Sequence, residues 1–148
     1  MTGQPTEGGT PKPTGPVIPP GEVLRRSVPE AAADAEGRPT SSAFIRSSHD
    51  EMMSTLRETV SGQEAAARWT GTSHLLGVWP VETAHLDSLS YVAYGDGGRP
   101  CACGTDDCPP YPEDHASVDL RGVSRGRREK FAQQMKARAK ELGPIYVV

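Results

Sequence analysis

The sequence is poor in aromatic residues, which make up 5% of its 148 residues, while hydrophobic residues as a whole make up 35%. A core formed from this composition must consist mainly of Val, Leu, Ala and Met side chains. No apolar run approaches the roughly 18 residues that span a membrane. No apolar stretch follows basic residues near the N-terminus either, so we expect no membrane association and no secretory signal.

Cysteine is also scarce, with three residues at Cys101, Cys103 and Cys108. An odd, clustered set argues against the disulfide framework of a small secreted protein, in which even numbers of cysteines are spread along the chain. A reducing compartment fits better, and there clustered cysteines more often bind metal or react than form disulfides. The sequence therefore predicts a cytoplasmic protein.

The first 21 residues have almost no side chains that could form a core. They contain six prolines and five glycines. Such a segment buries too little apolar surface to offset the entropy lost on ordering, so we expect residues 1–21 to be a disordered tail. The remaining residues, 22–148, are of a length typical of one domain.

Periodicity and capping signals divide residues 22–148 into short elements. A continuous apolar run at 74–81 predicts a buried central strand, and Ser61 with Glu64 forms a capping box that opens a helix at 61–69. Residues 47–60 fit both helical spacing and a short alternating strand, and we favour the helix. Further strands are expected at 22–28, 40–46, 90–94, 115–120 and 145–148, and further helices at 82–89 and 124–142.

The C-terminal elements have the clearest amphipathic patterns. The helix at 124–142 places Phe131, Met135 and Leu142 on one stripe, and Gly143 marks its end. In the strand at 115–120, His115 and Ser117 alternate with apolar residues and should point outward. Together these elements predict an α+β fold: a single two-layer domain with a mixed β-sheet, helices on one face and a long C-terminal helix.

Three short motifs resemble those of small uncharacterised α+β proteins of GC-rich bacteria. They are the segments at 37–44 (Gly-Arg-Pro-Thr-Ser-Ser-Ala-Phe), 76–79 (Leu-Gly-Val-Trp) and 115–118 (His-Ala-Ser-Val), the last followed by a basic helix. The resemblance covers roughly residues 22–147 and implies no activity. Where those proteins have a short acidic-Pro turn before the segment at 115–118, this chain carries a cysteine-rich insert.

The cysteine-rich loop at 97–114 has the ligand types of a zinc site. Cys101, Cys103 and Cys108 supply three thiolates, and His115 or Asp106 would complete a tetrahedral set for structural Zn²⁺. A metal would also order a loop that is too rich in Gly and Pro to pack by itself. The C-x-C spacing lacks a second paired motif, however, so thiols without metal fit equally well.

The charge is divided unevenly along the chain, although the net charge is only −3. Residues 121–148 carry +6 and residues 1–120 carry −9. A basic helix can bind phosphate backbones, which would use Arg125, Arg127, Arg128, Lys130 and Lys136. The same residues fit an ordinary solvated helix face.

The sequence contains no complete catalytic motif. Arg25 with Ser41 and Ser42 fits part of the nucleotide cleft of an ADP-ribosyltransferase, but Glu113, in a Pro-rich loop, is an unconvincing catalytic glutamate. We therefore expect a non-enzymatic binding or accessory protein that works through interaction with another protein. A nucleic-acid-associated protein and a nucleotide-dependent transferase are the two alternatives.

Overall fold

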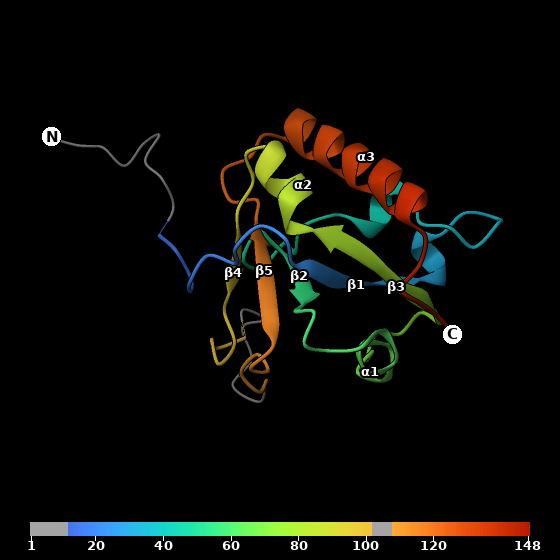
Figure 1. Ribbon diagram of the computed structural model, residues 1–148, viewed down its shortest axis with the longest axis horizontal. Coiled ribbons are helices and arrows are strands. Elements are labelled where there is room, and N and C mark those ends of the chain that lie inside the picture. The colour runs from blue at the N-terminus through green and yellow to red at the C-terminus, as the bar shows by residue number, and fades with distance from the viewer. Residues whose placement is uncertain (1–11, 102–107) are drawn as a thin grey trace, which may run out of the picture.

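The computed structural model describes residues 12–101 and 108–148 and has the α+β fold that the sequence predicts (Figure 1). Its sheet has six strands in the order β4-β5-β2-β1-β3-β6, and every neighbouring pair is antiparallel. The strands are β1 (Val23–Pro29), β2 (Met52–Leu56), β3 (Leu75–Glu82), β4 (Ala93–Gly95), β5 (His115–Asp119) and β6 (Tyr146–Val147). The helices are α1 (Gly62–Ala67), α2 (Thr83–Ser88) and α3 (Arg125–Leu142), with two 3-10 turns, η1 (Glu30–Ala32) and η2 (Ser41–Ala43).

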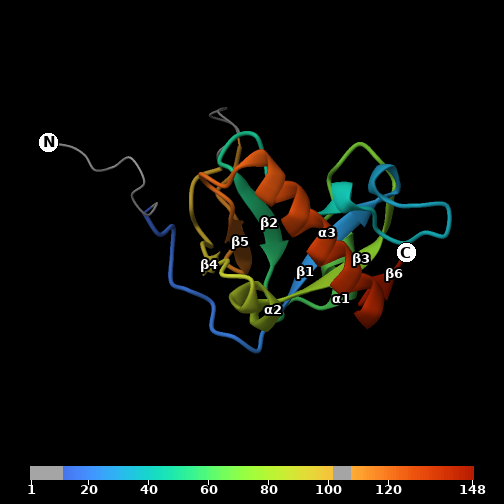
Figure 2. The same ribbon diagram turned by 90° about the horizontal axis from the view of Figure 1, so that it is seen from above.

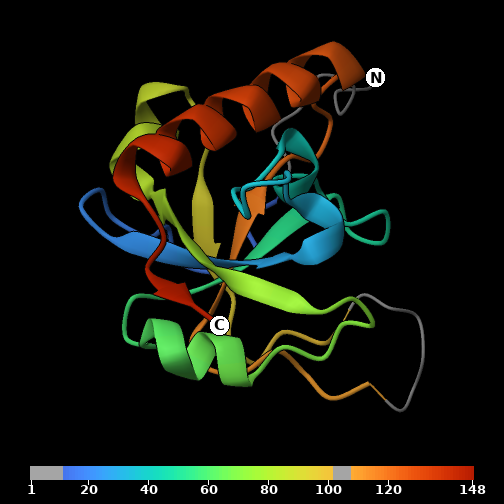
Figure 3. The ribbon, with the colours of Figure 1, turned by 90° about the vertical axis from the view of Figure 1, so that its right-hand side faces the viewer.

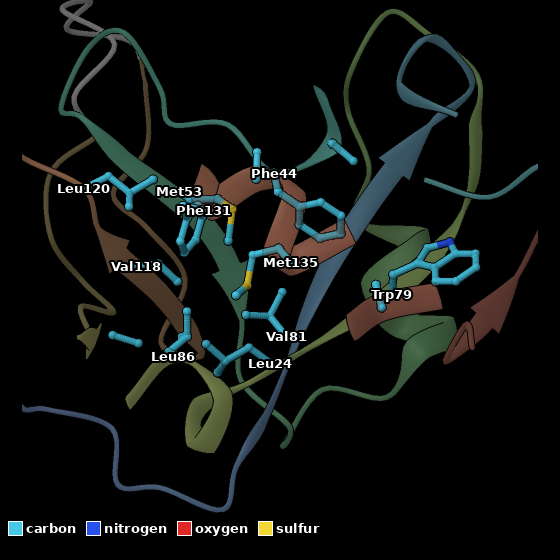
Figure 4. Close-up of a cluster of buried hydrophobic side chains, with 14 of the residues drawn as sticks. Leu24, Phe44, Met53, Trp79, Val81, Leu86, Val118, Leu120, Phe131 and Met135 are labelled. Atoms are coloured by element: carbon cyan, nitrogen blue, oxygen red, sulfur yellow. The ribbon is translucent and has the colours of Figure 1, made fainter. Parts of the chain in front are cut away.

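The main core lies between the sheet and the two helices α2 and α3, which cover the same face (Figure 3). Phe131 and Met135 of α3 reach down onto Met53 and Val81 of the sheet, as Figure 4 shows. A smaller cluster lies on the opposite face, where Ala65 of α1 packs on Val78. The helices therefore cover both faces, which corrects the expectation that they share one.

Capping residues set the ends of two helices. The Ser61 hydroxyl accepts a hydrogen bond from the Glu64 amide at 3.1 Å, which confirms the expected start of α1. Ser124 caps α3 in the same way. Gly143 follows α3 with φ of 82°, a conformation that favours glycine.

The secondary structure predicted from the sequence is wrong for two segments. Residues 47–60 contain the strand β2, not the favoured helix, because Met52–Leu56 pairs along its whole length with β5. Residues 40–46 form the short turn η2 and a loop, not a strand. Phe44 is nevertheless fully buried there, so its hydrophobicity serves the core without strand pairing.

Other expectations need smaller corrections. The sheet is antiparallel, not mixed, and β3 has only the two-residue β6 beyond it, so β3 is not central. Trp79 on β3 is 5% exposed, which agrees with its predicted burial, whereas Leu142 is 43% exposed and lies outside the core. No helix in the described part of the chain is long and apolar enough to cross a membrane.

Residues 12–21 pack along the edge of the sheet beside β4. The Ile18 amide donates to the carbonyl of Ala93 at 2.9 Å, and the Gly95 amide donates to the carbonyl of Pro16 at 2.8 Å. Ile18 is 4% exposed and belongs to the main core. The predicted tail, residues 1–21, therefore includes residues that pack on the domain. Residues 1–11 lie outside the described residues.

Candidate functional site

The sheet is split at one seam, between β1 and β2. These two strands pair at a single register position, Arg25 opposite Leu56. Beyond that position β1 continues along β3 and β2 continues along β5, so the two halves of the sheet run apart (Figure 2). The seam leaves backbone groups of β2 without a neighbouring strand.

Arg26 spans this seam with its guanidinium group. Its Nε donates to the carbonyl of Ala43 at 2.9 Å, and one terminal nitrogen donates to the carbonyl of Ser54, on β2, at 2.7 Å. The Arg26 side chain thus donates to the Ser54 carbonyl in place of the backbone amide of a paired strand. The two bonds fix the guanidinium between the diverging strands.

A pocket of about 470 Å³ opens along the seam, and we call it the seam pocket. Its walls come from both halves of the sheet, from the η2 region and from the segment around α1. Its polar and aromatic lining includes Arg25, Arg26, Ser42, Ser54, Arg68, Trp69, Thr70, Tyr111 and His115. Its volume lies in the range of small-molecule sites.

The charge of the seam pocket is positive and only partly compensated. Arg68 forms ion pairs with Asp114 at 2.6 Å and Glu64 at 3.1 Å. Within residues 12–101 and 108–148, no carboxylate lies within 4.0 Å of the guanidinium nitrogens of Arg25 or Arg26. Burial lowers the pKa of Arg26 to about 10, so the group keeps its charge at neutral pH although its side chain is partly buried.

A second feature of the pocket wall is a chain of three hydrogen-bonded side chains. Ser54 Oγ lies 2.8 Å from Nε2 of His115, and Nδ1 of His115 lies 2.6 Å from Oδ1 of Asp96. Ser54 is in the middle of β2, His115 begins β5, and Asp96 directly follows β4. The antiparallel pairing of these strands therefore brings together residues that are far apart in the sequence.

Asp96 is held by more than His115. The Ser117 hydroxyl donates to its Oδ2 at 2.7 Å, and Arg99 Nε donates to the same atom at 3.0 Å. Burial alone would raise the pKa of Asp96, but the hydrogen bonds from His115 and Ser117 outweigh this effect and hold the pKa below its usual value. Asp96 is therefore a buried carboxylate that stays ionised.

Tyr111 covers the His115 ring and closes the cluster. The two rings are stacked with centroids 3.9 Å apart and planes inclined by 11°. The Arg99 guanidinium lies over Tyr111 and donates to Asp50 at 2.9 Å. His115 and Ser117, which the sequence placed on an outward face, are thus buried beneath the base of the cysteine-rich loop.

The base of that loop is closed by backbone contacts. The Gly98 amide donates to the carbonyl of Tyr111, and the Tyr111 amide donates to the carbonyl of Arg99. Gly97 lies so close to the backbone of Glu113 that a Cβ would come within 2.3 Å of its carbonyl oxygen. The described ends of the loop are thus ordered by protein contacts, so a metal is not needed to order them.

The predicted zinc ligands are only partly described. Cys101 and Cys108 are half-buried, while Cys103 and Asp106 lie outside the described residues. Both ring nitrogens of His115 are engaged by Ser54 and Asp96, so a metal at His115 would have to replace one of these bonds. No group of three potential ligands gathers among residues 12–101 and 108–148, and the zinc site stays a prediction.

The predicted nucleic-acid residues lie on α3. Arg125, Arg127 and Lys130 are exposed, and Arg128 and Lys136 are partly buried. Arg125 pairs with Glu129 at 3.3 Å, and Arg128 donates to the carbonyl of Val123. The helix presents a basic surface that is separate from the seam pocket, and nucleic-acid binding stays a prediction.

Sequence reasoning missed most of the residues around the seam. It noted Arg25, Ser42 and His115, and the structure brings all three to the pocket wall. It gave no role to Arg26, Ser54 or Asp96. A usable signal was the polar Ser117 between Ala116 and Val118, because this strand position is buried and an apolar residue would be ordinary there.

The comparisons give the chain no family. We found no match among protein-family models, among curated proteins or among solved structures. The resemblance to small proteins of GC-rich bacteria therefore stays a prediction.

Proposed function

We propose that the protein binds a phosphate-bearing small molecule, of mononucleotide size, in the seam pocket. The observation that carries this proposal is the Arg26 guanidinium, which lines the pocket and has backbone carbonyls but no described carboxylate as partners. An anion in the pocket would supply the missing negative charge.

Desolvation makes the Arg26 charge costly. A charge that is partly removed from water and has no counter-ion is costly, and proteins ordinarily pair it or neutralise it. Arg26 donates two hydrogen bonds to described residues, whereas a guanidinium has five N–H donors. The remaining donors suit the planar, forked arrangement in which Arg binds phosphate or carboxylate oxygens.

The rest of the lining favours a phosphate attached to a planar ring. Trp69 provides an aromatic surface, and Ser42 and Thr70 provide hydroxyl donors. Aromatic side chains stack on nucleobases, and hydroxyls bind phosphate or ribose oxygens. A simple carboxylate would leave most of the 470 Å³ empty.

The proposal keeps the nucleotide ligand of the transferase that the sequence offered as an alternative. A nucleotide-dependent transferase was expected to use Arg25 with Ser41 and Ser42. Arg25 and Ser42 line the seam pocket, whereas Ser41 lines a separate hollow beside α3. Glu113 does not line the seam pocket. Binding of a nucleotide is therefore supported more strongly than the transfer of ADP-ribose, and a protein partner stays a prediction.

Thermal unfolding with added anions tests the proposal. Inorganic phosphate, pyrophosphate and ADP should raise the midpoint, with ADP effective at the lowest concentration, because a ligand that binds only the folded state stabilises it. Sodium chloride at matched ionic strength is the control for general screening. Arg26→Gln should remove the effect, and Arg26→Lys, which keeps the charge, should retain part of it.

A matched variant separates the pocket from the general charge of the protein. Arg46→Gln removes a guanidinium that pairs with Glu51 and lies outside the seam pocket, so it should leave the response to ADP unchanged. If wild-type protein shows no greater stabilisation by ADP than by chloride, the proposed function is wrong. Equal loss in the Arg46 and Arg26 variants would reject the pocket as the binding site.

A further inference from the structure

The hydrogen-bonded chain of Ser54, His115 and Asp96 has the order and spacing of a nucleophile, a base and a carboxylate that orients the base. The two links measure 2.8 Å and 2.6 Å, both within hydrogen-bonding reach. Such an arrangement is recognised by its geometry and by the role of each group, not by sequence order. Binding of an anion by Arg26 makes no use of it.

The histidine is fixed in the tautomer that a base requires. Asp96 is ionised and accepts a hydrogen bond, so Nδ1 of His115 carries the proton that it donates. The lone pair of Nε2 then faces the Ser54 hydroxyl. Stacking against Tyr111 prevents the ring from turning away.

The three groups differ in accessibility in the way that nucleophilic catalysis needs. Asp96 is 2% exposed and His115 is 5% exposed, whereas Ser54 is exposed and lines the seam pocket. A purely structural network would be served equally well by a covered serine. Here the Ser54 hydroxyl, at the end of the hydrogen-bonded series, lies at the wall of the seam pocket.

We propose that Ser54 is a catalytic nucleophile, activated by His115 and oriented through Asp96, and that the protein hydrolyses esters in the seam pocket. In this reaction Ser54 Oγ attacks the ester carbonyl carbon while its proton moves to Nε2 of His115. The bond to the alcohol oxygen breaks, and the alcohol leaves with that proton. Water, deprotonated by His115, then releases the acid from Ser54 and restores the hydroxyl.

Arg26 connects this chemistry to a substrate class. Its terminal nitrogen lies 2.7 Å from the main-chain oxygen of Ser54, so positive charge lies next to the nucleophile. An ester that carries a phosphate group would place the phosphate against Arg26 and the carbonyl near Ser54. This substrate class rests on the proposed anion binding, whereas the role of Ser54 does not.

The test is covalent labelling with an alkyl fluorophosphonate, in which Ser54 Oγ displaces fluoride from phosphorus. Peptide mapping should locate the label on Ser54, and Ser54→Ala should remove it. Ser88→Ala, which changes an exposed serine of α2 that does not line the seam pocket, should label normally. His115→Ala should lower the labelling rate by at least roughly a hundredfold, a typical contribution of a general base.

Asp96 acts through His115 and needs a readout that distinguishes positioning from stability. With p-nitrophenyl acetate, Asp96→Asn should lower kcat by roughly a hundredfold or more and leave KM nearly unchanged, because the variant keeps its shape but favours the wrong tautomer. Circular dichroism of Ser54→Ala, a change at an exposed position, checks that the fold is kept.

The outcomes separate the two proposals. An unlabelled Ser54 in protein that is still stabilised by ADP would overturn the catalytic role and leave anion binding intact. Labelled Ser54 in protein that ADP does not stabilise would support the nucleophile and reject a phosphate-bearing substrate. Equal labelling of wild type and His115→Ala would show that Ser54 is not activated by His115 and would overturn the proposal.

Discussion

The carboxylate of Asp96 accepts a hydrogen bond from Nδ1 of His115 over 2.6 Å, although the two residues are 19 positions apart. They bracket the cysteine-rich loop, since Asp96 precedes it and His115 follows it. One buried contact therefore ties the two ends of the loop together and orients the histidine that faces Ser54. Loop closure and the geometry of the candidate site depend on the same carboxylate.

Replacing Asp96 should destabilise the protein strongly. Asp96→Ala removes the acceptor of three side-chain donors, from His115, Ser117 and Arg99, and leaves the first two buried. We expect a loss of about 3 kcal/mol in the free energy of unfolding. Asp87→Ala, a change at an exposed carboxylate on α2, should stay within about 0.5 kcal/mol. Urea unfolding of both variants measures the difference, and equal effects would contradict the prediction.

The cost of losing Asp96 should depend on pH. The pKa of Asp96 in the folded protein is lowered, below about 3.9, the value expected in the unfolded chain. The ionised group therefore stabilises the fold above about pH 4, and this contribution is lost as the pH falls through the folded pKa. The gap in stability between wild type and Asp96→Ala should be largest near neutral pH and shrink in acid. A constant gap would contradict this linkage.

Local sequence signals predicted the parts of the fold that depend on neighbouring residues. The cap at Ser61 and the apolar run that forms β3 were found because each is encoded within a few residues. β2 was missed because Met52 and Leu56 also fit a helical period, and only pairing with β5 decides between the two. The seam and the buried His115 depend on contacts between distant segments, which no local period encodes.

Tyr111 should ionise late on alkaline titration. Burial, with a further contribution from the charge of Asp50, raises the pKa of Tyr111 to about 12. Because the unfolded value is about 10, protonated Tyr111 stabilises the fold below about pH 10, and this contribution is lost as the pH rises towards 12. Tyr111→Phe should lack this loss, so its stability should approach or pass that of wild type at high pH. Parallel alkaline losses in the two proteins would show that Tyr111 is not the group involved.

Trp79 and Trp69 offer a matched test of the core. Trp79 is 5% exposed on β3, and Trp79→Ala should lower the free energy of unfolding by about 3–5 kcal/mol. Trp69 is partly exposed beside the seam pocket, with its indole nitrogen bonded to the carbonyl of Ser73, so Trp69→Ala should cost less. Denaturant unfolding gives both values. A larger loss for Trp69 would mean that the segment after α1 contributes more to the core than its exposure indicates.

Ile18 and Val17 test whether the segment before β1 belongs to the domain. Ile18 is 4% exposed and its amide donates to Ala93, whereas the neighbouring Val17 is 60% exposed. Ile18→Ala should cost about 2 kcal/mol, near the lower end for buried aliphatic residues because the site lies at the sheet edge. Val17→Ala should change stability by less than about 0.5 kcal/mol. The two substitutions are adjacent in sequence and similar in chemistry, so a difference in thermal midpoint reports burial at this edge. If both variants match wild type, residues 12–21 do not stabilise the fold, and the domain begins near residue 22, as the composition of the sequence predicted.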